Sequence, residues 1–300
     1  MPAPAKPRPK REVVMAVVQP SANAVVRLLE RTSVAPWQVV VGHTLLGFLA
    51  AALVASASHA NWLAAAVLLQ VKTVLDNVDG GLARATGRVT EFGRYLDTLC
   101  DLAVNVALFA ALSRHGSALG SAAAFAIVTV ALSADFGAQK RYEEVRGLRT
   151  RPATGAAPNG RSSSASSSAE PGMSPGPTTR SRADSSATAP WLLKTARSVY
   201  RLVLAPQDRA YEALDSRLFR TASGQAWGHA IGAERERWAD LFSTGALVNL
   251  GLSTQYLALG VALALGMPYA YVVICWCQLP YLLTVQAVRV LRYRGVGGRR

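Results

Sequence analysis

The sequence predicts an all-α integral membrane protein with six transmembrane helices and with both termini in the cytoplasm. Two features of the 300-residue composition support this fold class: 51% of the residues are hydrophobic, and only 17% are charged. A soluble domain normally carries about 25% charged residues. The charged residues also gather between the apolar stretches instead of mixing with them, as in a protein that crosses the membrane several times.

Six apolar stretches have the length of a membrane span. The core of a bilayer requires about 20 apolar residues in a helix. We expect spans at residues 38–56, 61–76, 93–112, 118–136, 241–265 and 269–288. Only Gly266, Met267 and Pro268 separate the last two, so these two should form an antiparallel helical hairpin.

The distribution of basic residues predicts the orientation. The formal net charge is +14, and Lys and Arg gather at both termini, in the loop with Arg84 and Arg88, and in the long central segment. The opposite side has short connectors in which Arg114 is the strongly basic residue. Because basic loops stay in the cytoplasm, both termini should lie there, in a protein of the cell membrane. Basic tails can also bind nucleic acid, but these flank apolar spans, so we expect no nucleic-acid partner.

The predicted spans divide the chain into five segments. The central insertion should be cytoplasmic, and its Ser- and Pro-rich middle, residues 151–189, should be disordered because it has almost no large apolar residue to bury. Residues 191–204 and 208–219 return to helical spacing and should lie along the membrane surface. The segments are a basic cytoplasmic arm with an interfacial helix (1–37), four spans (38–136), the cytoplasmic insertion (137–240), two spans (241–288) and a basic tail (289–300).

Four aspartates should converge at the cytoplasmic edge of the membrane. Asp76 and Asp79 are three residues apart at the end of the second span, and Asp97 and Asp101 are four apart near the start of the third. Residues at these spacings share one face of a helix. Asn105 continues the stripe of the third span by one more turn.

This acidic cluster predicts a metal site. One Asp at the centre of a spanning helix costs roughly 2.5–3.5 kcal/mol, and four together also repel one another. Oxygen ligands in this number suit Mg²⁺, Mn²⁺ or Ca²⁺ better than zinc. The alternative is a structural network in which Arg84 and Arg94 neutralise the carboxylates, although two arginines would leave the cluster partly uncompensated.

The residues between the two aspartate pairs favour a diphosphate ligand. Gly80 and Gly81 should allow a phosphate to approach the backbone where the chain leaves the membrane. The side chain of Ala83 is small, so it should not block this approach. Arg84 presents a guanidinium fork that suits a pyrophosphate, and Gly93 should open space on the helix beneath the metals.

Residues 76–101 as a whole follow the pattern D-x-x-D-G-x-x-A-R, eight residues, G-x-x-x-D-x-x-x-D. This pattern resembles the signature of the CDP-alcohol phosphotransferase (CDP-alcohol phosphatidyltransferase) family, and every defining position is filled. The resemblance implies two divalent cations, Mg²⁺ or Mn²⁺, with Asp76, Asp79 and Asp97 as ligands. Asp101 would touch the second metal and act as the catalytic base. The CDP pocket would be lined by Gly80, Ala83, Arg84 and Gly93.

The resemblance also implies the reaction and its partners. A phospho-alcohol group would pass from a CDP-linked donor, such as CDP-diacylglycerol in the bilayer, to an alcohol, with release of CMP in phospholipid biosynthesis. The acceptor would be a small alcohol or a phosphorylated polyol. An anionic acceptor could be contacted by Lys140, Arg141, Arg197 and Arg201, although binding to anionic lipid explains these residues equally well. Dimers are common among the relatives.

Other functions remain open at the level of sequence. An intramembrane prenyltransferase also uses aspartates and Mg²⁺ but does not need the glycines and arginine at these spacings, and a cation transporter usually carries its acids near the bilayer midplane. An inactive scaffold would not need the intact motif. His43, Asn249 and Gln255 are polar residues within spans, where helix–helix hydrogen bonds are favoured over substrate contacts.

Overall fold

The computed structural model describes residues 12–148 and 190–297, and all regular elements in these two ranges are helices. The predicted all-α class is therefore confirmed for the described part of the chain, whereas the expected disorder of residues 151–189 lies outside it. The α-helices are α1 (Met15–Leu29), α2 (Pro36–Val54), α3 (His59–Ala85), α4 (Glu91–Leu112), α5 (Ala118–Val145), α6 (Pro190–Val203), α7 (Ala205–Ser223), α8 (Gly232–Trp238), α9 (Leu241–Val248), α10 (Leu252–Ala264) and α11 (Ala270–Gly297).

Four of the described helices are long and apolar enough to cross a membrane: α2, α4 with the short turn after it, α5 and α11. The bent pair α9 and α10 could make a fifth span. The predicted second span lies in α3, which is not among them because polar residues such as Gln70 and Lys72 interrupt its apolar stretch. An integral membrane protein with four or five candidate spans is thus supported, while six spans and cytoplasmic termini stay a prediction.

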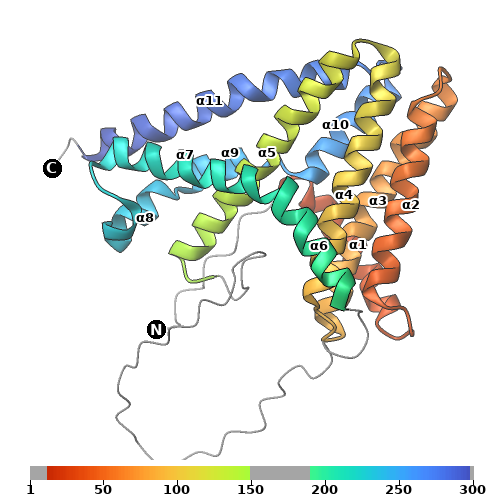
Figure 1. The fold of residues 1–300 in the computed structure, drawn as a ribbon, viewed down its shortest axis with the longest axis horizontal. Helices are drawn as coiled ribbons and strands as arrows, with labels where there is room; N and C mark the ends of the chain where they lie inside the picture. Colours follow the sequence, from red (N-terminus) through yellow and green to blue (C-terminus); the bar gives the residue numbers. More distant parts are fainter. Residues whose placement is uncertain (1–11, 149–189, 298–300) are drawn as a thin grey trace, which may run out of the picture.

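Helices α2, α3 and α4 pack side by side and carry the main core together with α5, α10 and α11 (Figure 1). The close approach of α2 and α4 depends on Gly47. A Cβ atom at this position would lie 2.7 Å from the side chain of Val104, closer than packed carbon atoms can come. This contact brings α2 and α4 close together, with the side chain of Lys72 on α3 beside them.

Helix α3 is longer than the sequence suggested. We expected the chain to turn out of the membrane at Gly80 and Gly81, but α3 continues through both residues to Ala85. That expectation is wrong because two consecutive glycines do not end a helix that neighbouring helices hold in place. The turn comes at Gly87, whose φ of 67° lies in the left-handed region that glycine adopts without strain.

The fifth predicted span is broken. Residues 241–265 form two helices, α9 and α10, with a bend of 50° between them, so the prediction of one continuous helix is wrong. The break is stabilised from the other end of the chain: Glu12 accepts hydrogen bonds from both the backbone N–H and the hydroxyl of Thr254, each at 2.7 Å. The backbone N–H of Val13 donates to Asn249 at the bend.

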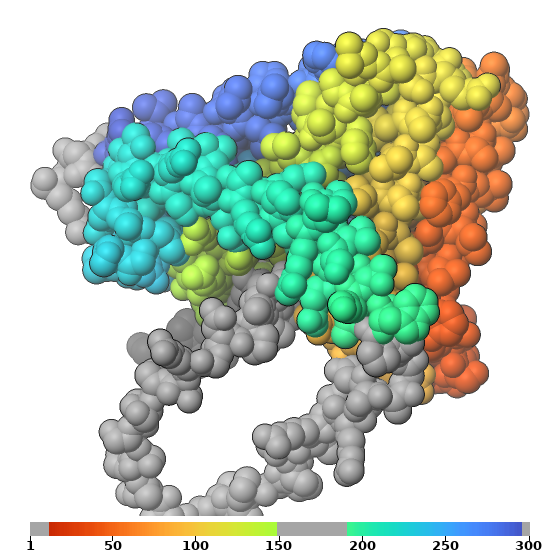
Figure 2. All heavy atoms as spheres, viewed as in Figure 1, coloured from red at the N-terminus to blue at the C-terminus, as the bar shows by residue number. Residues whose placement is uncertain are grey.

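The insertion helices pack against the spans. The structure confirms helices near both predicted ranges, α6 and α7, and α5 extends to Val145, nine residues beyond the predicted end of the fourth span. Helix α6 contacts α4, and α7 contacts α5 and α11. Figure 2 shows α6 and α7 as a continuous layer over one face of the molecule. The insertion therefore contributes to the body of the protein.

Candidate functional site

The structure brings the four predicted aspartates together. Asp76 and Asp79 lie on α3, and Asp97 and Asp101 lie on the facing side of α4. Together with His43 of α2, their ligand atoms form two overlapping groups in which all atoms lie within 4.8 Å of one another. One group joins His43 with Asp79 and Asp97, and the other joins it with Asp76 and Asp101.

The donor atoms of this cluster suit a divalent cation. Oδ1 of Asp76 and Oδ1 of Asp97 are buried, and neither accepts a hydrogen bond from a described residue. Buried carboxylate oxygens without a donor are costly unless a cation faces them. Several carboxylate oxygens at this spacing are the ligand set that Mg²⁺ and Mn²⁺ prefer. The residues present therefore fit the metals that the sequence pattern implies.

Lys72 also belongs to the cluster, and the sequence analysis missed it. Its side chain is fully buried, and its Nζ donates a hydrogen bond of 2.6 Å to Oδ1 of Asp101. The same ammonium lies 3.9 Å from Asp76 and 4.9 Å from the ring centre of Tyr256 on α10. A lysine within an apolar stretch, four residues before an aspartate, was the signal that could have revealed it.

His43 has a larger part in the site than expected. Its side chain is fully buried, and Nε2 lies 3.2 Å from Oδ2 of Asp79, which is a contact between α2 and α3. The same nitrogen is 3.9 Å from Asp76 and 3.8 Å from Asp97. It therefore lies where a metal bound by these carboxylates would also be within its reach.

Two side chains other than arginines take part in the electrostatics of the cluster. Lys72 lies within ion-pair distance of Asp76 and Asp101, and His43 lies within that distance of Asp76, Asp79 and Asp97. Lys72 carries one positive charge beside four carboxylates, and Oδ1 of Asp76 and Oδ1 of Asp97 still lack a hydrogen-bond donor among the described residues. The side chain of Arg84 is exposed and lies against Gly80, where a Cβ atom would come within 3.2 Å of the guanidinium.

The other residues predicted for the nucleotide pocket lie at the facing ends of α3 and α4. Ala83 is partly buried in the last turn of α3, on the same helix as Gly80 and Arg84. Gly93 is in the first turn of α4, where its N–H donates a 3.0 Å hydrogen bond to the hydroxyl of Thr90. The position of Gly93 is one turn before Asp97.

Three of the four basic residues expected to contact an anionic acceptor are engaged with carboxylates of the protein. Lys140 pairs with Glu212. Arg141 lies 3.3 Å from Asp215 and donates to Ser216. Arg197 lies 2.7 Å from Glu91 on α4. These pairs connect the insertion helices to α4 and α5, and none of these basic residues lines the cavity described next.

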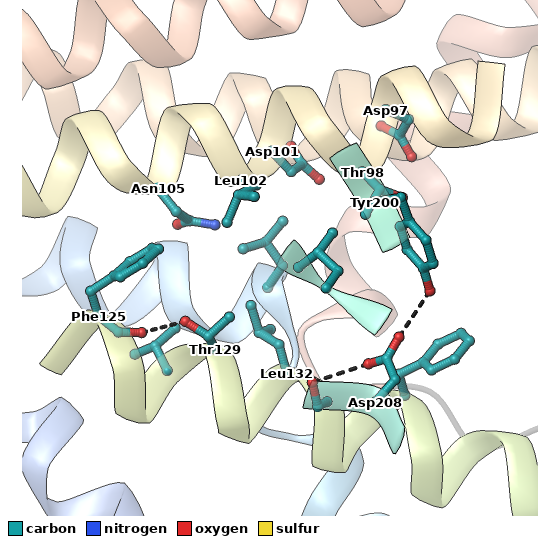
Figure 3. A pocket seen from close by; sticks show the side chains of 15 residues that line it. Asp97, Thr98, Asp101, Leu102, Asn105, Phe125, Thr129, Leu132, Tyr200 and Asp208 are labelled. Carbon is teal, nitrogen blue, oxygen red and sulfur yellow. Dashed lines mark hydrogen bonds between the residues drawn. The ribbon is translucent and has the colours of Figure 1, made fainter. Parts of the chain in front are cut away.

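A cavity of about 240 Å³ opens beside the aspartate cluster (Figure 3). Asp97 and Asp101 form part of its wall on α4, and residues of α5, α6, α7 and α10 complete it. The lining consists of Asp97, Thr98, Asp101, Leu102, Asn105, Phe125, Val128, Thr129, Leu132, Ser133, Phe136, Tyr200, Leu204, Asp208 and Leu252.

Asp208 of α7 faces this cavity across from α4 (Figure 3). Ser133 donates to one of its carboxylate oxygens at 3.1 Å, and the hydroxyl of Tyr200 donates to the other at 2.9 Å. Burial, together with the neighbouring Asp208, raises the pKa of Tyr200, so its hydroxyl keeps its proton at neutral pH. The sequence analysis did not find Asp208 as a site residue, because an acid near the start of a helix is an ordinary feature of helices.

Comparisons with known proteins agree with the geometry. Residues 34–147, from the start of α2 to the end of α5, match the model of the family described as CDP-alcohol phosphatidyltransferase. The resemblance stated from the sequence is thus confirmed for this part of the chain, which contains all four aspartates. Helices α6 and α7 lie outside the match.

Three curated proteins are similar over shorter stretches. The chain is 42% identical over 80 residues to a bifunctional IPC transferase and DIPP synthase of Aquifex aeolicus, covering 27% of this chain and 18% of that protein. It is 42% identical over 59 residues to an archaetidylinositol phosphate synthase of Pyrococcus horikoshii, covering 19% and 31%. It is 33% identical over 103 residues to a phosphatidylinositol phosphate synthase of Corynebacterium glutamicum, covering 34% and 44%. The chain spans less than half of the length of each of these relatives.

Proposed function

Because residues 34–147 match the CDP-alcohol phosphatidyltransferases, we propose that this chain transfers a phosphatidyl group from CDP-diacylglycerol to an alcohol and releases CMP. The observation that carries the proposal is the convergence of four aspartates from α3 and α4, with buried carboxylate oxygens that lack a hydrogen-bond donor among the described residues. This arrangement suits the binding of a diphosphate through divalent cations at the membrane surface.

The aspartates would hold two divalent cations, Mg²⁺ or Mn²⁺. Asp76, Asp79 and Asp97 are ligands in this proposal, and Asp101 contributes to the second metal. His43 lies within reach of the same carboxylates and fixes the orientation of Asp79 through its 3.2 Å contact. Once bound, the cations would neutralise the donor diphosphate and stabilise the negative charge on the leaving CMP.

Asp101 is the proposed catalytic base. It would orient the acceptor hydroxyl and take its proton as the oxygen attacks the phosphorus that carries the diacylglycerol. A new bond between that oxygen and phosphorus forms, and the bond between the phosphorus and the oxygen of CMP breaks. Lys72 donates to Oδ1 of Asp101 and thereby holds this carboxylate in one orientation, which makes Lys72 a positioning residue.

The nucleotide would bind at the facing ends of α3 and α4. Gly80, Ala83 and Gly93 have small side chains or none, and Arg84 offers a fork for a phosphate oxygen. Support comes from the position of the Arg84 guanidinium, which would lie 3.2 Å from a Cβ atom at Gly80 and thus places a cation beside this glycine.

The proposal includes six spans, with α3 as the sixth and with the active site and both termini facing the cytoplasm. The charged residues of α3 do not need to contact lipid, because Lys72 is fully buried and Asp79 is 6% exposed. A helix with charges on its buried side can cross a bilayer inside a bundle. The excess of basic residues in the loops supports the orientation.

The test is CMP release by the purified protein in detergent with CDP-diacylglycerol, Mg²⁺ or Mn²⁺ and a panel of alcohols. We expect metal-dependent release by the wild type and a loss of at least about 100-fold in Asp97→Asn, since a metal ligand is removed. Asp240→Asn is the matched control: this aspartate caps α9 away from the cluster, and asparagine also caps helices well.

A second measurement needs no acceptor. CDP-diacylglycerol with Mn²⁺ should raise the temperature of unfolding of the wild type, because a ligand that binds the folded state stabilises it. The same addition should have little effect on Asp97→Asn. If the wild type shows neither this stabilisation nor CMP release with any alcohol, the proposed function is wrong.

A further inference from the structure

We propose that the cavity between α4, α5 and the insertion helices binds the acceptor, and that it selects an alcohol without a phosphate group. This inference rests on the proposed function and specifies its second substrate. The cavity has the required position, because Asp101 belongs to its lining and the attacking hydroxyl must come within hydrogen-bond reach of this carboxylate.

The charges around the cavity argue against a phosphorylated acceptor. Three lining residues are carboxylates: Asp97, Asp101 and Asp208. Neither Lys nor Arg is among the lining residues in the described ranges. Metals at the cluster would compensate Asp97 and Asp101, but Asp208 lies across the cavity on α7 (Figure 3). A phosphate bound there would face a carboxylate without a compensating cation, which is strongly unfavourable.

The polar groups of the lining instead suit hydroxyl or ammonium donors. Asp208 accepts hydrogen bonds from Ser133 and Tyr200, which fix its orientation. A carboxylate has about four lone-pair positions, so it can accept a further bond from a ligand. A neutral polyol or an amino alcohol would supply such a donor, and its other hydroxyl would be free to approach Asp101.

Asn105 provides an independent indication of a ligand. It is 7% exposed, and its amide points into the cavity between Asp101 and Phe125 (Figure 3). It lies one turn after Asp101 on α4, in the wall of the cavity. An amide can donate and accept at once, so it can bind a hydroxyl of a polyol in either direction.

The remaining walls limit the size of the acceptor. Leu102, Phe125, Val128 and Leu132 give the cavity an apolar surface, which can contact the carbon skeleton of a small alcohol. The polar groups lie at separate places on this surface (Figure 3). Because Tyr200 and Asp208 come from helices outside the family match, the insertion would determine which acceptor this chain uses.

The experiment compares acceptors at saturating CDP-diacylglycerol and Mn²⁺. Inositol, glycerol and ethanolamine are tested beside inositol phosphate and glycerol phosphate, and CMP release is measured. We expect release with at least one phosphate-free alcohol and at least about tenfold less with its phosphorylated form. Inositol and glycerol distinguish a neutral polyol from ethanolamine, an amino alcohol that would pair with Asp208.

Variants test the assignment of the cavity. Asp208→Asn and Asn105→Leu should raise the KM for the acceptor by about tenfold or more, with an unchanged KM for CDP-diacylglycerol, because each weakens a hydrogen bond to the acceptor and neither residue is placed at the donor site. Asp208→Asn also changes the acceptor of the bonds from Ser133 and Tyr200, so Asn105→Leu is the cleaner of the two variants. Glu212→Gln is the matched control, since Glu212 lies one turn after Asp208 on α7 and does not line the cavity. If Asp208→Asn does not fold, Thr129→Val removes a polar group from the wall that α5 forms.

Three results would overturn the proposal. The first is turnover with phosphorylated polyols in preference to their phosphate-free forms. The second is a change of the KM for CDP-diacylglycerol in the variants while the KM for the acceptor stays the same, which would mean that the lipid occupies the cavity. The third is stabilisation by CDP-diacylglycerol with no CMP release from phosphate-free alcohols, and this result would leave the proposed donor binding intact.

Discussion

Lys72 is fully buried beside the carboxylates that it partly neutralises. Its positive charge is therefore stabilised by their negative charges, and theirs by its own. Its ammonium lies 2.6 Å from Asp101 and 3.9 Å from Asp76. Removing one member of a buried ion pair usually costs about 3–5 kcal/mol, because the other member stays buried without a partner. A divalent cation at the cluster would supply the missing positive charge.

This relation predicts the behaviour of Lys72→Met, which keeps the length of the side chain and removes its charge. Without metal, the variant should unfold at a lower temperature than the wild type. Added Mn²⁺ should raise its unfolding temperature by more than it raises that of the wild type, because the cluster then has more negative charge to compensate. Thermal unfolding with and without Mn²⁺ measures both effects.

Lys140→Met is the matched control, since Lys140 pairs with Glu212 outside the cluster. It should respond to Mn²⁺ as the wild type does. An equal Mn²⁺ response in Lys72→Met and in the wild type would show that Lys72 and the metal do not act on the same carboxylates.

For single residues, the sequence predicts that the aspartates lie on one face of each helix, but it does not predict which other side chains contact them. Asp97 and Asp101 share a helix face because of their spacing alone, and the same local geometry holds for Asp76 and Asp79. Their contacts with His43 depend on how α2 packs against α3 and α4, which no local pattern contains. Asp208 is more remote still, since it joins the site through the packing of an insertion outside the family match.

Among the elements, α2 and α4 depend on one glycine for their distance. A methyl group at Gly47 would overlap with Val104, whereas a methyl group at Gly42 of the same helix would meet open space. Forcing an extra carbon into a packed interface typically costs about 1–3 kcal/mol. An alanine in place of an exposed helical glycine instead stabilises by roughly 0.5–1 kcal/mol.

We therefore expect Gly47→Ala to lower the unfolding temperature and Gly42→Ala to leave it unchanged or raise it. Gly47→Ala should also weaken the binding of Mn²⁺, because the separation of α2 from α4 sets the distance of His43 from Asp97. Thermal unfolding and a titration with Mn²⁺ measure the two effects. Equal stability of the two variants would show that the α2–α4 contact can relax at little cost.

The ends of a helix were predictable where the length of an apolar stretch determined them. They were not predictable where contacts with residues far away in the chain determined them. The spans expected at 38–56 and 93–112 agree with α2 and α4 to within two residues at each end. The break between α9 and α10 was not predictable, because Glu12 stabilises it from more than 200 residues away in the chain. A continuous apolar stretch predicts a continuous helix unless such a partner is known.

At the scale of the whole molecule, contacts between the insertion and α11 fix the position of α7. Arg289 of α11 is 3% exposed and donates a 2.7 Å hydrogen bond to Asp215 of α7. The same guanidinium donates to the backbone carbonyl of Trp238, whose ring lies beneath it. A buried pair with this many hydrogen bonds fixes the position of α7, and with it the wall of the cavity that Asp208 provides.

The proposed topology makes a prediction at this scale. In a variant without Cys100, Cys275 and Cys277, a cysteine introduced by Leu119→Cys should react with a membrane-impermeant thiol reagent in sealed right-side-out vesicles. A cysteine introduced by Arg88→Cys should react only after the vesicles are permeabilised, because its loop is expected in the cytoplasm. Labelling is measured by the mass of the protein.

Both positions are exposed, so burial does not prevent either reaction. Labelling of both cysteines in sealed vesicles would mean that the chain between them does not cross the membrane as proposed. The reversed pattern would mean that the orientation is wrong.

The cover that α10 provides for α3 has a consequence for biosynthesis. Gln70 donates a hydrogen bond to the backbone of Tyr256, whose ring faces Lys72, so α10 shields the polar side of α3. During translation α3 leaves the ribosome about 180 residues before α10 does. For that interval the polar side of α3 has no protein cover from α10, so the nascent helix must remain near the insertion machinery or the membrane surface until the later helix arrives.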